Sequence, residues 1–275
     1  ENLSIKSVSY LDSLQGVADH IDLAIISTNA DVRREVIETL LYGRHVKYMI
    51  IEKVAFQSTW DFKAVMGLLE ERRVRAWVNC PRRMYPFFKR LKARTRNASR
   101  VSLRVEGCDW GLASNAIHML DLLAFLTDQL TYEIVWENLD NQIYESKRKG
   151  FIELGGELWI DSKRGDTLQL IDRRDCEEPL RLSIVFDGVV VELNQKAGMS
   201  CEYLDGQRGK AKSSDFKMPL QSELTSIQVD KVLKYGNSEL SPLEESYLLH
   251  KPLLQVFNRH VSAILNQDTE ACPIT

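Results

Sequence analysis

The sequence has no run of about 18 apolar residues, the minimum for a membrane-spanning helix. Residues 1–6 lack the basic and then apolar pattern of a secretory signal. The net charge of −3 gives no general attraction to nucleic acid or to an anionic membrane. These absences predict a globular protein with neither a membrane nor a nucleic acid as partner, and the cytoplasm is the expected location.

Cysteine motifs are also missing. The five cysteines are odd in number and widely scattered, with no Cys-x-x-Cys pair: Cys80, Cys108, Cys176, Cys201 and Cys272. This spacing argues against a disulfide framework or a zinc site and favours free thiols in a reducing compartment. The histidines show no metal-ligand spacing either, so we expect no metal.

Two short apolar runs each lead directly into polar residues. Residues 22–27 read as a buried strand followed by Thr28 and Asn29, and residues 46–51 as another followed by Glu52 and Lys53. In an open parallel sheet, ligands bind at the carboxyl ends of the strands. The pattern predicts a crevice lined by hydroxyl, amide, carboxylate and ammonium groups. No Gly-x-Gly-x-x-Gly turn precedes Asp22.

Strands and helices alternate from residue 22 to 104. A helix is predicted over residues 32–42, another begins after Ser58 or Thr59, and residues 74–78 form a third strand. Such alternation is typical of βαβ units with a parallel sheet. We interpret residues 1–98 as part of a Rossmann-type dinucleotide-binding domain.

After about residue 125, strand-like segments follow one another without intervening helices. Asp187-Gly188 between two apolar runs predicts a tight hairpin. The predicted strands are 132–136, 151–160, 167–171, 180–186, 189–193 and 200–203. Residues 99–275 are therefore expected to form a second, α+β domain with a mainly antiparallel sheet.

Two helices are predicted to close the chain. One opens at Gln221. The last begins at Ser241-Pro242-Leu243-Glu244, which reads as a capping box with proline at the first helical position. Pro252 should kink or restart that helix.

The order of four motifs resembles the oxidoreductase family named for glucose-fructose oxidoreductase, inositol dehydrogenase and MocA. The family's strand followed by Ala-Thr-Pro/Asn is similar to residues 25–29, and its Glu-Lys-Pro to Glu52-Lys53, with Val54 in place of proline. Arg-x-x-Pro matches residues 83–86. Asp-x-Gly-x-His-x-x-Asp matches in part, since His118 and Asp121 remain while Ser114 and Ala116 differ.

The resemblance, which runs from about residue 8 to the end, implies a Rossmann domain followed by an open-sheet domain and an NAD or NADP cofactor. It implies a sugar or nucleotide-sugar substrate and a homo-oligomer formed through the antiparallel sheet. The residue roles it implies are catalysis by Lys53 and His118 with support from Asp121, cofactor binding by Thr28, Asn29, Glu52 and Lys53, and substrate binding by Arg83 and Asn115. Residues 272–275 resemble the terminus of relatives in bacterial surface-polysaccharide pathways.

Two departures from the family pattern support a different hypothesis. The match begins after the glycine-rich phosphate turn, so we expect a fragment, a trimmed chain or a truncated natural product. Ser114 stands where the family has a carboxylate one turn before the histidine. The alternative is a non-catalytic protein that keeps the fold, lacks cofactor binding and interacts through its sheet.

Each candidate residue also has a structural interpretation. Lys53 could pair with Glu52 in solvent, and His118 could be a satisfied residue of an apolar helix. Residues 82–104 contain nine basic and no acidic side chains. We interpret this run first as a solvated helix, second as a site for an anionic substrate and only third as a nucleic-acid face.

Overall fold

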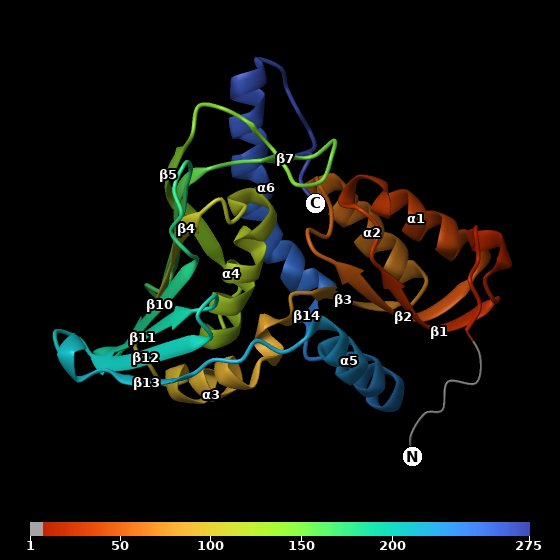
Figure 1. Ribbon diagram of the computed structural model, residues 1–275. Helices are drawn as coiled ribbons and strands as arrows, with labels where there is room; N and C mark the ends of the chain where they lie inside the picture. The colour runs from red at the N-terminus through yellow and green to blue at the C-terminus, as the bar shows by residue number, and fades with distance from the viewer. Residues whose placement is uncertain (1–7) are drawn as a thin grey trace.

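Two sheets organise residues 8–275, which the computed structural model describes (Figure 1). Sheet A has the order β1-β2-β3-β14. Its strands are β1 (His20–Ile26), β2 (His45–Glu52), β3 (Arg75–Asn79) and β14 (Ser241–Pro242). The first three run parallel, with Ile26 opposite Ile51 and Ile51 opposite Val78. Their carboxyl ends therefore meet at one edge, as the sequence predicts.

Amphipathic helices connect these strands. They are α1 (Ala30–Gly43) and α2 (Thr59–Glu71), and they bury Ile37 and Leu41 of α1 and Phe62 and Val65 of α2. The predicted cap of α2 is confirmed, because the Ser58 hydroxyl accepts from the Asp61 N–H at 3.0 Å. The expected strand and helix alternation is present.

Sheet B is larger and mostly antiparallel, with the order β13-β12-β11-β10-β4-β9-β8-β5. Its strands are β4 (Val101–Cys108), β5 (Tyr132–Leu139), β8 (Gly156–Ser162), β9 (Thr167–Arg173), β10 (Arg181–Phe186), β11 (Val189–Asn194), β12 (Met199–Leu204) and β13 (Lys212–Asp215). Only β4 and β9 pair in parallel. Asp187 and Gly188 join β10 to β11 with φ of 46° and 74°, which confirms the predicted hairpin. A separate small ribbon pairs β6 (Tyr144–Glu145) with β7 (Ile152–Glu153).

Helices cover one face of sheet B. They are α3 (Pro86–Thr95) and α4 (Leu112–Thr127) (Figure 1). The strand β4 alternates, burying Val101, Leu103 and Val105 while Arg104 and Glu106 point to the other face. That second face is left open.

The end of the chain returns to sheet A. The helix α5 (Gln221–Tyr235) packs beside β1, and β14 pairs antiparallel with β3. The final helix, α6 (Leu243–Leu265), contacts α2, α4 and β5 and so ties the sheets together. The predicted domain division at residues 98 and 99 stays a prediction.

For this last segment, one expectation is wrong and another is wrong in part. Ser241 does not cap α6, because it lies in β14 opposite Val78, and α6 begins at Leu243 without a side-chain cap. Pro252 does not restart the helix, which is continuous from Leu243 to Leu265, so of the two expected effects only a kink remains a prediction. The pairing of β14 fixes Ser241 in extended backbone, and this tertiary contact overrides the local capping signal.

The prediction of five free thiols is also wrong. Cys108 at the end of β4 and Cys176 in the loop after β9 form a disulfide with a Cα–Cα distance of 5.7 Å. The parallel pairing of β4 with β9 brings residue 108 opposite Arg173 and so places the two thiols together. Cys80, Cys201 and Cys272 are free.

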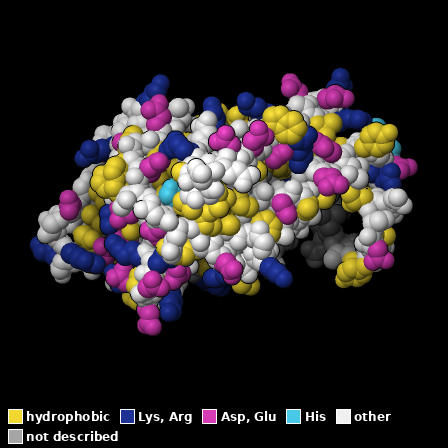
Figure 2. All heavy atoms as spheres, turned by 90° about the horizontal axis from the view of Figure 1, so that it is seen from above, with side chains coloured by type: hydrophobic (Ala, Val, Ile, Leu, Met, Phe, Trp, Pro, Cys, Tyr) yellow, Lys and Arg dark blue, Asp and Glu magenta, His cyan; other side chains and the backbone are white. Residues whose placement is uncertain are grey.

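The basic run of residues 82–104 is only in part a solvated helix: α3 covers its middle with its apolar side buried, whereas Arg83 is buried before the helix and Arg104 lies on β4. Phe88 and Leu91 are in the core, and five of the nine basic side chains are in ion pairs. The paired residues are Arg83, Lys89, Lys92, Arg94 and Arg104. Figure 2 likewise shows basic and acidic side chains interspersed over the upper surface. No helix in residues 8–275 is long and apolar enough to cross a membrane.

Arg33 joins the carboxyl ends of the strands of sheet A. Its side chain is fully buried, and its guanidinium donates to the carbonyls of Thr28, Val54 and Ala55. Burial lowers the pKa of Arg33 to about 10, so the group remains charged at neutral pH. The segment after β1 and the segment after β2 are thus held by one side chain.

We expect Arg33→Met to lower the free energy of unfolding by about 3 kcal/mol or more, because buried carbonyls lose a charged donor. Chemical denaturation measures this change. The control is Arg34→Met on the same helix. Arg34 forms partly exposed ion pairs with Glu38 and Asp61, so its loss should cost less than about 1 kcal/mol. Equal effects of the two substitutions would contradict the role of Arg33.

Candidate active site

Polar side chains from three strands gather at the carboxyl edge of sheet A. Thr28 and Asn29 follow β1, and Glu52 ends β2. The carboxylate of Glu52 accepts from the Asn79 amide at the end of β3 at 2.9 Å. The parallel register therefore brings the predicted cofactor-binding residues to one edge.

Lys53 connects this edge to sheet B. Its Nζ donates to the Ser114 carbonyl at 3.1 Å and lies 3.5 Å from Asn115 Oδ1, in the first turn of α4. Burial lowers the pKa of the Lys53 ammonium below its ordinary value of 10.5, and the Glu52 carboxylate opposes this shift. Lys53 is therefore a partly buried amine whose neutral form is easier to reach than that of a surface lysine.

His118 lies one turn further along α4. Its ring is partly exposed, but Nδ1 is buried and has no hydrogen-bond partner among residues 8–275. Burial holds the pKa of His118 well below 6.5, and the charges of Arg82 and Lys53 act in the same direction. The ring is neutral at physiological pH. Lys53 therefore contacts the helix α4 one turn before His118.

Asp121 shares a helical face with His118 and from the sequence could orient its ring, but it is bound elsewhere. Both of its carboxylate oxygens accept from Arg83, at 2.8 and 2.9 Å, in a pair that is almost completely buried. Asp121 lies three residues after His118 and faces the segment that carries Arg83. The structure brings Arg83 and Asp121 together, and their part in substrate binding or catalysis stays a prediction.

Two carboxylates that sequence reasoning missed hold the start of α4. Asp172 on β9 accepts from the N–H groups of Trp110, Gly111 and Leu112 at 3.0–3.2 Å. Glu153 on β7 accepts from the N–H of Ala113 at 2.6 Å and of Ser114 at 3.2 Å. Negative charge is favourable at a helix N-terminus, where backbone N–H groups lack helical partners. Glu153 is 39 and 40 positions from the two residues whose N–H groups it binds and Asp172 is 60 to 62 from its three, so no local motif marks them.

Several buried polar atoms near this edge lack a partner among the described residues: Thr28 Oγ1, Arg33 Nε, Arg82 Nε and His118 Nδ1. At the same edge, the exposed Asn29 and the partly exposed Glu52 and Lys53 offer polar groups of the kind that the nicotinamide and ribose end of a dinucleotide requires. The diphosphate end normally lies on a glycine-rich turn at a helix N-terminus. Within residues 8–275 no such turn follows a strand of sheet A, and the first N–H of α1 donates to Thr275 Oγ1 at 3.0 Å. The described residues therefore fit one end of the cofactor.

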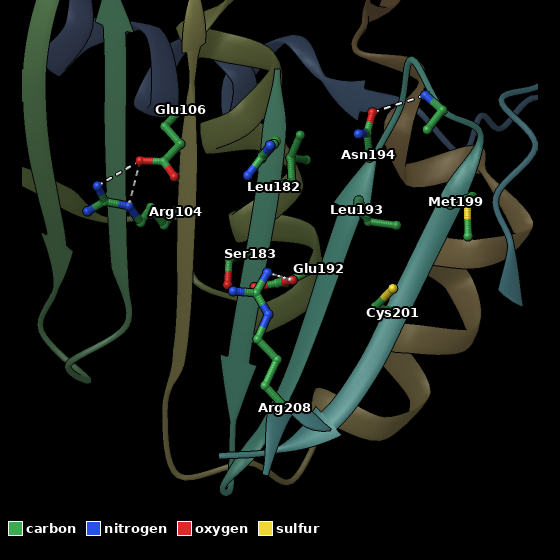
Figure 3. A pocket seen from close by; sticks show the side chains of 12 residues that line it. Arg104, Glu106, Leu182, Ser183, Glu192, Leu193, Asn194, Met199, Cys201 and Arg208 are labelled. Carbon is green, nitrogen blue, oxygen red and sulfur yellow. Dashed lines mark hydrogen bonds and ion pairs between the residues drawn. The ribbon is translucent and has the colours of Figure 1, made fainter. Parts of the chain in front are cut away.

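A separate hollow of about 400 Å³ lies on the open face of sheet B (Figure 3). Its charged residues largely pair with each other, as Arg104 does with Glu106 and Arg208 with Glu192 at 2.8 and 2.9 Å. The sheet separates this hollow from α4, because Arg104 and Glu106 point away from the helix-covered face. It does not contribute to the site at Lys53.

Comparison with solved structures identifies the fold. UDP-N-acetylglucosamine 3-dehydrogenase GnnA from Acidithiobacillus ferrooxidans matches 94% of this chain and 84% of its own, with 16% identity and a TM-score of 0.67. A dehydrogenase (MviM) from Clostridium difficile matches 90% and 82%, with 16% identity and a TM-score of 0.65. A super-repressor mutant of Gal80p from Saccharomyces cerevisiae matches 88% and 78%, with 12% identity and a TM-score of 0.62.

The dehydrogenases among these structures are oxidoreductases of the type that the sequence resembles, and the chain shares their two-sheet fold. No protein-family model and no curated protein matches the sequence. At these identities, the likeness is one of fold.

The carboxylate of Asp172 generates a prediction about stability. Burial raises the pKa of Asp172 from 3.8 to about 6, although Arg174 and the backbone donors oppose this shift. The folded protein thus holds this proton more tightly than the unfolded chain. The resulting stabilisation is complete below pH 4 and is lost as the pH rises through 6.

We expect the difference in unfolding free energy between the parent protein and Asp172→Asn to fall by about 3 kcal/mol from pH 4 to pH 7. Asparagine keeps an oxygen that can accept from the backbone N–H groups. Urea unfolding at a series of pH values measures the change. Asp175→Asn, in the exposed loop after β9, is the control and should give a constant difference. A constant difference for Asp172→Asn as well would refute the prediction.

Proposed function

We propose that this protein is an NAD(P)-dependent oxidoreductase that acts on a hydroxyl group of a sugar or nucleotide sugar. The observation that carries the proposal is Lys53, an amine of lowered pKa held on the first turn of α4 beside the neutral ring of His118. The fold shared with dehydrogenases, one of them a UDP-N-acetylglucosamine 3-dehydrogenase, supports it. The similarity of residues 272–275 to surface-polysaccharide relatives favours that pathway.

Oxidation of a secondary alcohol removes a proton from oxygen and a hydride from carbon. When bound, the nicotinamide supplies the hydride acceptor. Neutral Lys53 Nζ accepts the hydroxyl proton, and its lowered pKa increases the fraction of neutral amine near neutral pH. The neutral ring of His118 accepts a second hydrogen bond from the substrate or takes the proton itself. In the reverse reaction the same groups return the proton.

The remaining residues position the two ligands in this proposal. Thr28, Asn29 and Glu52 lie where the nicotinamide and its ribose would be held. Asn115 Nδ2 donates to the Trp110 carbonyl at 2.8 Å, which fixes its Oδ1 near Lys53 and so near a substrate hydroxyl. The contacts of Arg83 favour a supporting role under α4, because the guanidinium is committed to Asp121.

The competing hypothesis is a non-catalytic interaction protein. The fold match to Gal80p, whose Kluyveromyces lactis counterpart is described as a transcriptional regulator, favours it. So does the lack of a glycine-rich phosphate turn in residues 8–275. Quenching of tryptophan fluorescence by NADH and NADPH separates the two hypotheses. Saturable binding in the micromolar range supports the enzyme, and no binding by the product of the full coding sequence supports the interaction protein.

We expect Lys53→Met and His118→Asn each to lower kcat for hydroxyl oxidation by roughly 10²- to 10⁴-fold, the usual contribution of general acid–base catalysis. Cofactor binding should change much less. Steady-state kinetics with NAD and NADP over a panel of sugars and nucleotide sugars measures the effect. Lys47→Met, an exposed lysine on β2, is the matched control. Unchanged kcat in Lys53→Met would rule out the proposed base.

The open face of sheet B is the proposed surface for homo-oligomer formation. Trp136 and Trp159 pack together there, with ring centroids 5.0 Å apart, and are 41% and 40% exposed. Exposed aromatic pairs of this kind are typical of interfaces.

We therefore expect Trp159→Glu to convert a dimer to monomers, since a carboxylate would be buried at the contact. Analytical ultracentrifugation at micromolar concentration measures this shift. Tyr42→Glu replaces an aromatic residue that is 89% exposed on α1 and should leave the association unchanged. A dimer that persists in Trp159→Glu would place the interface elsewhere.

A further inference from the structure

A buried carboxylate from the small ribbon lies against the first turn of α4. Glu153 is only 6% exposed. Its Oε1 accepts from the N–H groups of Ala113, Ser114 and Leu154 at 2.6, 3.2 and 3.1 Å. Its Oε2 accepts from the Ser114 hydroxyl at 2.6 Å. Glu153 is therefore bound to Ser114, and the carbonyl of Ser114 accepts a hydrogen bond from the Lys53 ammonium at 3.1 Å.

The contact matters because of the residue type at position 114. The resembling family has a carboxylate there, and this chain has a serine. In the structure, Glu153 on β7 places a negative charge beside position 114. The Ser114 hydroxyl donates to this carboxylate and so links it to the helix.

The surrounding backbone is arranged to hold Glu153 in place. Tyr144 on β6 is its ladder partner, and the N–H of Ile152 donates to the Pro273 carbonyl at 2.9 Å. Gly111 is left-handed with φ of 78°, and a Cβ there would lie 2.9 Å from Glu153 Oε2. A side chain at position 111 would thus push the carboxylate away from the helix.

We propose that Glu153 is a positioning residue of the oxidoreductase site, supplying through Ser114 the negative charge that position 114 lacks and fixing the turn of α4 on which Lys53 is held. This inference rests on the proposed function. A carboxylate that merely caps α4 would affect stability alone, whereas a positioning carboxylate also sets the protonation of Lys53.

The electrostatics around the carboxylate agree with this role. The charge of Glu153 acts to raise the pKa of Lys53, Asp172 and Cys272. Burial has the largest effect on the pKa of Lys53 and lowers it, Glu52 and Cys80 act to raise it more strongly than Glu153 does, and Arg148 acts to lower it. Removal of the Glu153 charge should lower the pKa of Lys53. The limb of the pH–rate profile that depends on the neutral Lys53 amine should then move to lower pH.

The test compares Glu153→Gln, which keeps the shape and removes the charge, with Glu153→Asp and with the double variant Ser114→Asp/Glu153→Gln. In Glu153→Gln we expect the limb of kcat against pH to move to lower pH. The double variant places a carboxylate at position 114 and should return the limb to its position in the parent protein. Glu153→Asp keeps the charge and should leave the limb at that position. Glu145→Gln, an exposed residue on β6, is the control and should leave the limb unchanged.

A second readout does not require catalysis. Labelling with acetic anhydride at a series of pH values, followed by mass spectrometry of the Lys53 peptide, measures the pKa of this amine directly. A lower pKa in Glu153→Gln supports the proposal even if no oxidoreductase activity is found, which would then count against the proposed function alone.

The proposal is overturned if folded Glu153→Gln shows the parent pH limb and the parent Lys53 pKa. Far-UV circular dichroism establishes that each variant is folded. If Glu153→Gln does not fold, the double variant decides: a restored limb and Lys53 pKa support the inference, and lowered values in a folded double variant overturn it.

Discussion

The contact between Lys53 and the first turn of α4 is the constraint on which the candidate site depends. Lys53 extends from the end of β2 in sheet A, and Ser114 and Asn115 belong to the helix that covers sheet B. The backbone N–H groups of that turn are bound by Asp172 and Glu153. An ammonium at one side and carboxylates at the other thus fix a helix start, where the peptide dipoles favour negative charge. The position of His118, one turn further along α4, depends on these contacts at the helix start.

Much of the fold is predictable from local patterns. The apolar runs before Thr28 and Glu52, the cap at Ser58 and the Asp187-Gly188 turn all specify what the structure contains. The failures share a cause, which is pairing between segments far apart in the chain. Ser241 lies in a good capping sequence, but it pairs with β3 as part of β14 instead. Cys108 and Cys176 come close enough to form a disulfide because β4 pairs with β9. Local propensity carries no information about such partners.

The residues of the candidate site also fall into those that the sequence reveals and those that it does not. Lys53 and His118 can be selected from the sequence, because both lie in motifs of the family that the chain resembles, and their catalytic roles stay a prediction. Glu153 and Asp172 cannot, since their partners are 40 to 60 residues away and nothing near them in sequence marks a buried carboxylate. The pair of Asp121 with Arg83 is a further case: both residues can be selected by motif, but only the coordinates show that they satisfy each other.

The strand β1 forms an outer edge of sheet A among residues 8–275. An edge strand offers its outward N–H and C=O groups to any extended chain, whatever its sequence. If the open face of sheet B joins two copies, that contact closes on itself, whereas a second self-complementary surface on the same molecule would link dimers into an open polymer. The exposed Asp22 in the middle of β1 places a charge where such growth would start. Charged side chains on an edge strand disfavour such edge-to-edge pairing.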